Sequence, residues 1–117
     1  MTLISQTATY DTLLMNTNGG ALYTAHIPTG TPMKPVVKLV RSSGWAFQQV
    51  LASPCGRYGT LVVGVGSNAV PSVFAVGHAT GTSTVIVPYG AANGALVGTA
   101  LHERVAPAWL TPPHNGE

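Results

Sequence analysis

Short apolar runs separated by turn residues constrain this chain more than any other feature of its sequence. The runs are rich in Val, Leu, Ile, Thr and Tyr, which favour strands, and Gly, Pro, Asn and Ser stand between them. The i, i+3, i+4 apolar spacing of a helix is nearly absent. The predicted strands are Thr12–Asn16, Gly20–Ile27, Pro35–Arg41, Phe47–Ala52, Thr60–Val65, Ser72–Val76, Thr82–Pro88 and Ala95–Leu101.

These strands predict one small all-β domain. A chain of 117 residues is long enough for one hydrophobic core and too short for two. Many short strands in such a chain indicate an antiparallel sandwich, a barrel or a propeller-blade-like unit. We expect residues 12–105 to form the β domain and residues 1–11 and 106–117 to be extended terminal arms, the second because it is rich in proline.

A weak internal repeat divides the predicted domain into residues 12–58 and 59–105. Its period is roughly 48 residues, within the range that signals repeat architectures. Three pairs of segments carry the repeat: Thr12–Leu14 with Thr60–Val62, Leu22–Ala25 with Val73–Val76, and His26 with His78, the two histidines each preceding Thr-Gly-Thr. Two units and a fraction are too few to close a propeller ring within one chain.

Charged residues are unusually scarce. Lys, Arg, Asp and Glu make up 7% of the chain, whereas an ordinary soluble domain carries about 25%. Between Ser42 and His102 the only one is Arg57. The apolar content of 45% still supplies a core, and no run of about 18 uninterrupted apolar residues could span a bilayer. We therefore expect a folded protein that buries neutral surface against other protein chains, its own copies among them.

Other features of the composition bear on compartment and partners. Met1–Gln6 lacks the basic and apolar regions of a secretory signal, which predicts synthesis in a cytoplasm, with the protein kept there or released by lysis. Cys55 is the single cysteine, so no internal disulfide is expected. The net charge of +2 is small, and Lys34, Lys38 and Arg41 form the only basic cluster, which argues against a nucleic-acid partner.

Groups able to perform catalysis are also scarce. The carboxylates are Asp11, Glu103 and Glu117, too few for a two-carboxylate hydrolase. His102 beside Glu103 has no nucleophile nearby in the sequence, and Cys55 fits a simple turn thiol, although Arg57 is close enough to favour its thiolate. The sequence therefore predicts that the chain is not an enzyme.

The candidate cofactor and metal motifs lack the neighbouring residues that such sites require. Gly64–Ala69 fits the G-x-G-x-x-A pattern of dinucleotide sites, but Val70-Pro71 follows it where a helix is required. His26 and His78 lack the carboxylate or thiolate partners that zinc needs, so we interpret them as residues that anchor turns. No cofactor and no metal is predicted.

Five aromatic side chains are the candidate site residues. Aromatic rings stack on sugars, and they also fill cores and subunit interfaces, which is their commoner use. The five are Trp45, Phe47, Tyr58, Tyr89 and Trp109. Trp109 belongs to the predicted C-terminal arm, where an apolar anchor suits docking on a neighbouring chain.

Part of the chain resembles β-propeller repeats of the tachylectin type. The residues that carry the resemblance are Gly44-Trp45, Phe47, Val50-Leu51, Pro54, Gly56, Leu61, Val65 and Val73-Phe74. It implies an oligomeric propeller that binds carbohydrate. The spacing is irregular and the Trp motif occurs once, so no sugar-binding residue is assigned.

A looser resemblance is to phage capsid decoration proteins. It rests on the charge-poor β domain, the predicted N-terminal arm, and Val87-Pro88-Tyr89 followed by Asn93–Gly98. It implies packing on a capsid lattice. Two hypotheses follow: a structural β protein of a virion surface or other particle, and, as the alternative, an oligomeric propeller-like lectin.

Overall fold

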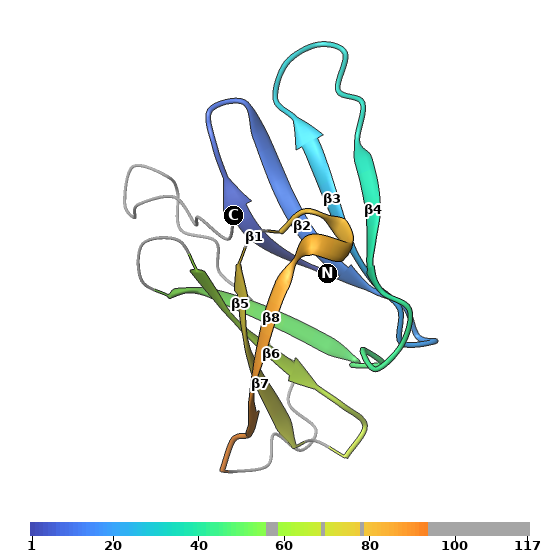
Figure 1. Ribbon diagram of the computed structural model, residues 1–117, viewed down its shortest axis with the longest axis vertical. Helices are drawn as coiled ribbons and strands as arrows, with labels where there is room; N and C mark the ends of the chain where they lie inside the picture. The colour runs from blue at the N-terminus through green and yellow to red at the C-terminus, as the bar shows by residue number, and fades with distance from the viewer. Residues whose placement is uncertain (56–58, 69, 78, 94–117) are drawn as a thin grey trace.

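The computed structural model describes residues 1–55, 59–68, 70–77 and 79–93, which form eight strands and one 3-10 turn (Figure 1). In order along the chain these are β1 (Thr2–Gln6), β2 (Tyr10–Asn16), β3 (Leu22–Pro28), β4 (Val36–Arg41), β5 (Gln49–Cys55), β6 (Gly59–Val65), β7 (Pro71–Gly77), η1 (Gly81–Ser83) and β8 (Val85–Ala91). The prediction of an all-β fold is confirmed.

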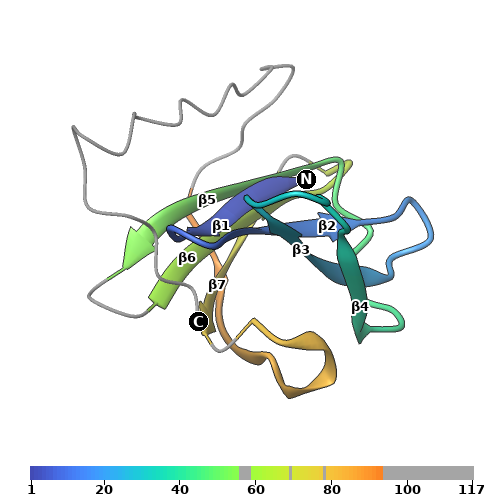
Figure 2. The ribbon, with the colours of Figure 1, turned by 90° about the horizontal axis from the view of Figure 1, so that it is seen from above.

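The strands form two antiparallel sheets, each a simple meander. The first sheet has the order β1-β2-β3-β4 and the second β5-β6-β7-β8, so strands adjacent in sequence are adjacent in space. The sheets do not close into a barrel. They meet along two margins, because β1 contacts β5 and β4 contacts η1, and the space between them holds the core (Figures 1 and 2).

One hydrophobic core lies between the two sheets. Its fully buried members come from both sheets and from the connections next to them: Ile4, Leu14, Leu22, Val40, Trp45, Val50, Val62, Val76 and Ala79. Buried threonines join it, and the Thr60 hydroxyl of the second sheet donates to the Ile4 carbonyl of the first over 3.1 Å. Hydrogen bonding of this kind removes the cost of burying a hydroxyl between apolar layers.

Three strands at sheet margins, β1, β4 and β8, carry an irregularity in register. The pairing skips one residue in each, at Ile4, Val40 and Tyr89. A β-bulge of this kind strengthens the local twist and redirects a side chain. Ile4 and Val40 are thereby buried in the core, whereas Tyr89 is 69% exposed.

Residues 42–48 connect the two sheets, and this connection crosses one end of the core. Asn16 of β2 holds this connection, because its Nδ2 donates to the Trp45 carbonyl over 2.9 Å and to the Phe47 carbonyl over 2.7 Å. Gly20 lies beneath it with a positive φ of 88°, and a Cβ there would approach backbone nitrogens of the connection at 3.3 Å. Asn16 and Gly20, which are distant in sequence from this connection, thus fix its course from one sheet to the other.

Most predicted strands shift by one to three residues at an end, and differences in the elements themselves lie at the N-terminus and before β8. Residues 2–6, expected to belong to an N-terminal arm, instead pair as β1 with β2 and bury three residues, Thr2, Ile4 and Ser5. The strand predicted at 82–88 begins with η1 and runs as Val85–Ala91. The predicted strand 95–101 and the C-terminal arm 106–117 lie outside the described residues.

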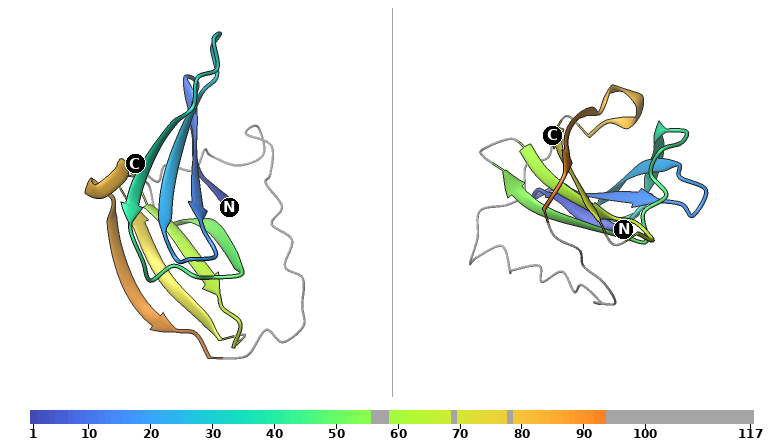
Figure 3. Two further views of the ribbon diagram at one scale, coloured as in Figure 1. Left: turned by 90° about the vertical axis from the view of Figure 1, so that its right-hand side faces the viewer. Right: turned by 90° about the horizontal axis from the view of Figure 1, so that it is seen from below.

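The two sheets share one meander order (Figure 3), but they span residues 2–41 and 49–91 and so do not coincide with the predicted repeat units 12–58 and 59–105. Thr12 and Thr60 take equivalent places in β2 and β6, and both are fully buried. In the third strands the pairing makes Thr24 equivalent to Phe74, so the sequence alignment of that strand is wrong by one residue. A one-residue error exchanges the two faces of a strand.

Candidate interaction surfaces

The outward sides of both sheets are the main candidate sites. Side chains of a strand alternate between its two faces, so residues next to the core positions point away from the partner sheet. In most antiparallel sheets those residues are polar because they meet water. Here they are mostly apolar on both sheets, which accounts for the nearly continuous apolar runs in the sequence.

The outer side of the second sheet, which we call the second-sheet face, has no charged residue among the described residues. Two cross-strand rows form its centre, one joining Leu51, Val63 and Val73 and the other joining Ser53, Leu61, Ala75 and Val87. Val87 and Val85 at the β8 edge are 46% and 48% exposed. The face is thus neutral and mostly apolar among the described residues, with half-buried side chains at its centre and exposed ones at the β8 edge.

The outer side of the first sheet, the first-sheet face, is similar but carries one carboxylate. Its rows join Leu3, Leu13, Ala25 and Val37, and Met15, Tyr23 and Leu39. Val37 is 54% and Leu39 41% exposed on the edge strand β4. Asp11, opposite Ile27 in the next row, has a buried Oδ1 without a hydrogen-bond partner within the described part of the chain.

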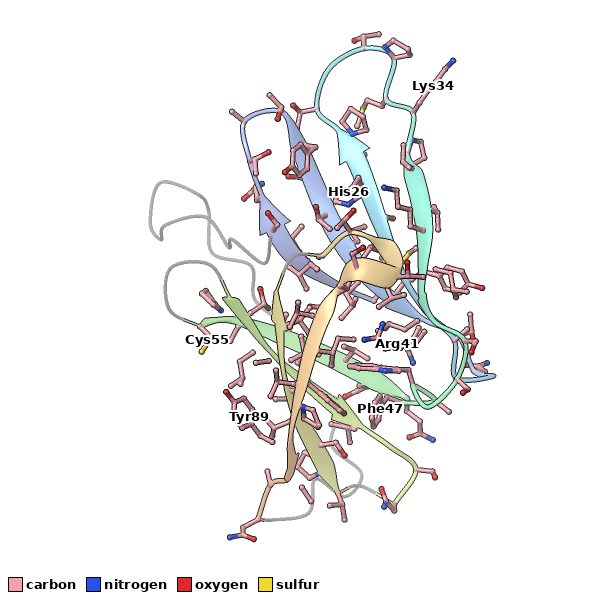
Figure 4. All side chains as sticks on the ribbon, viewed as in Figure 1. His26, Lys34, Arg41, Phe47, Cys55 and Tyr89 are labelled. Carbon is pink, nitrogen blue, oxygen red and sulfur yellow. The ribbon has the colours of Figure 1, made fainter. Side chains whose placement is uncertain are left out.

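The aromatic candidates separate into core and surface. Trp45 is 5% exposed and packs against Phe74 with ring centroids 4.5 Å apart, and Phe47 contacts both rings edge-on. These two candidates therefore serve the core. Tyr89 is exposed at the bulge of β8 (Figure 4), whereas Tyr58 and Trp109 lie outside the described residues.

Two titratable side chains of the first sheet, His26 and Arg41, make hydrogen bonds that hold the fold. His26 Nδ1 and the Thr12 hydroxyl share a hydrogen bond of 2.9 Å, and the Tyr10 ring meets the imidazole edge-on at 5.5 Å. Arg41 is used structurally, since its guanidinium donates to the Val40 carbonyl over 2.8 Å and to the Thr84 carbonyl over 3.4 Å (Figure 4). His26 was expected to anchor a turn, but its hydrogen bond links β3 to Thr12 of β2. Its predicted repeat partner His78 lies outside the described residues.

The remaining candidates for chemistry are not brought together. Cys55 is an exposed free thiol at the end of β5, and Arg57, His102, Glu103 and Arg104 lie outside the described residues. Within the described part of the chain, no three His, Cys, Asp or Glu residues are placed to hold a metal ion. Nor does that part contain a helix long and apolar enough to cross a membrane.

The G-x-G-x-x-A motif has a packing explanation at its first glycine. Gly64 is in the middle of the sheet at β6, and a Cβ there would lie 2.6 Å from the Phe47 ring. The glycine thus provides space for an aromatic side chain. Ala69, the last residue of the motif, lies outside the described residues.

Neither the sequence nor the fold of this chain matches a protein-family model, a curated protein or a solved structure. The surfaces must therefore be interpreted from their own chemistry. The sequence predicted neutral surface but not its location, because strands that are apolar on both sides do not show which side faces the core.

Proposed function

We propose that this chain is a non-enzymatic structural β protein that works as part of a larger particle, such as a virion surface or a capsid. The observation that carries the proposal is the pair of outward apolar sheet faces. Contiguous apolar patches of more than a few hundred Å² are rare on monomers and mark interaction sites. Each outer side joins half-buried apolar rows to exposed apolar side chains at its edge strand, Val37 and Leu39 on the first sheet and Val85 and Val87 on the second, on surfaces nearly free of charge.

The edge strands support the same proposal. β4 and β8 are unpaired on one side within the described residues, and each carries exposed valines. Natural monomers protect such edges with charges, prolines or bulges. Here the bulges at Val40 and Tyr89, Lys38 in β4 and Pro88 in β8 give only partial protection, which is compatible with edges that neighbouring chains cover.

The test is whether the purified chain assembles and binds particles. We expect a mass above that of one chain in native mass spectrometry, and co-sedimentation with capsids isolated from the same source, whose resistance to heat should rise. A chain that stays monomeric and does not bind those capsids contradicts the proposal.

The alternative is an oligomeric propeller-like lectin, which one specific observation favours. A four-stranded meander is the unit from which propeller blades are built, and this chain contains two of them in succession. Binding of the unmodified chain to a glycan array, with loss of binding on competition by the free sugar, supports this alternative. A blank array contradicts it.

A further inference from the structure

We propose that the second-sheet face is the site at which a second copy of this chain binds, so that two second sheets stack face to face about a twofold axis. This inference rests on the proposed function, because it names the first contact of the assembly. It commits to one face and one partner.

The area of the face is the first argument. Four strands spaced about 4.8 Å apart, each about 22 Å long for seven residues, give a flat projection of roughly 420 Å². The accessible area of a face covered with side chains is larger than its projection. A stable interface takes about 800 Å² of accessible surface from each partner, so the flat projection of one such face alone is about half of what a dimer requires.

Charge distinguishes this face from the first-sheet face. Stacking two first-sheet faces would bring two Asp11 carboxylates into a dry interface, where unpaired charges are costly. The second-sheet face buries only neutral side chains among the described residues, with Val63 and Val73 at its centre. A twofold contact of this face with itself therefore contains no charge to desolvate.

Shape argues for a copy of the same chain. Val, Ala and Leu side chains standing on a sheet form low ridges, and the inner sides of the two sheets already show that such surfaces stack in this fold. Closed twofold dimers are the commonest soluble homo-oligomers, and each patch then meets its own complement. A matched apolar sheet face is the surface that a second copy supplies.

The test compares two identical substitutions on opposite faces by sedimentation velocity, from micromolar to submillimolar concentration. Val73→Glu places a carboxylate at the centre of the proposed interface, and Val37→Glu places one on the first-sheet face. We expect the unmodified chain and Val37→Glu to dimerise, and Val73→Glu to dissociate with a Kd raised at least about 100-fold. Far-UV circular dichroism checks that each variant keeps its strands.

A second measurement decides the case in which Val73→Glu unfolds. In a Cys55→Ser background, Val73→Cys should form an intermolecular disulfide under mild oxidation, and Val37→Cys should not. The inference is overturned if the unmodified chain is monomeric throughout, if Val73→Glu dimerises normally, or if only the Val37 variants respond. If Val37→Glu alone disrupts an oligomer, the chain still assembles and the proposed function stands without this interface.

Discussion

Gly64→Ala is expected to destabilise the fold although it adds a single methyl group. A Cβ at this position would lie 2.6, 2.7 and 2.8 Å from three carbons of the Phe47 ring, whereas ordinary contact begins at 3.4 Å. The ring must therefore move by at least 0.8 Å, the difference between 3.4 and 2.6 Å. In a close-packed core such displacement is resisted by every neighbour of the ring.

Phe47 has little freedom to withdraw. Its ring contacts Trp45 and Phe74 at centroid distances of 5.6 and 5.8 Å, and its backbone carbonyl accepts the 2.7 Å hydrogen bond from Asn16. Overpacking at such a site costs about 2 kcal/mol. For a domain of this size that cost lowers Tm by roughly 6 to 10 °C.

The assay is urea unfolding followed by far-UV circular dichroism at one fixed protein concentration, since association changes apparent stability. Gly30→Ala is the matched control, because nothing lies within 4 Å of a Cβ built there; it should be neutral or stabilising by about 0.5 kcal/mol. Phe47→Leu should relieve the overlap, so the double variant should lose at least about 1 kcal/mol less than the sum of the singles. Additive losses, or a Gly64→Ala variant as stable as the parent chain, would refute this account of the glycine.

Three further predictions concern the connection, the thiol and the surfaces. Asn16→Ala should cost about 2 kcal/mol in urea unfolding, because it leaves the part-buried Trp45 and Phe47 carbonyls without their donor; Asn16→Asp, which also lacks that donor, should not restore stability. Cys55 should react with a thiol reagent in the folded protein as fast as a small thiol does, since it is exposed; slow labelling would contradict its placement. Self-association should strengthen in sodium sulfate and change little in sodium chloride, since the second-sheet face has no charged residue among the described residues; dissociation by sodium chloride would indicate an ionic interface.

Much of this fold was accessible from the sequence, because turn residues and β-branched runs are local signals. The first strand was missed for a physical reason. Thr2–Gln6 is short and has no turn residue before it, and only its pairing with β2 gives its alternation a meaning. At the other end, Pro71 begins β7 and Pro88 lies in the marginal strand β8, positions where a missing N–H is tolerated.

The location of the candidate site was less accessible, because it depends on which side of each strand faces the partner sheet. A strand that is apolar on both sides shows no polar–apolar alternation that would identify the side facing the core. The bulges at Ile4 and Val40 add residues that break the simple period. Asn16 and Gly64 act through contacts with the distant connection, which no local pattern in the sequence shows.

The way the two repeats face each other affects which assembly the chain can build. Successive propeller blades are related by rotation about the ring axis, so equivalent residues of two neighbouring blades point the same way round the ring. In this chain Leu14 and its equivalent Val62 are instead buried in one shared core, each pointing toward the other sheet. The inner faces of the two sheets therefore pack against each other, and only their outer faces remain available for contact with other chains. Growth through the remaining faces adds sheet upon sheet, which favours pairs and stacks of copies and weighs against a ring.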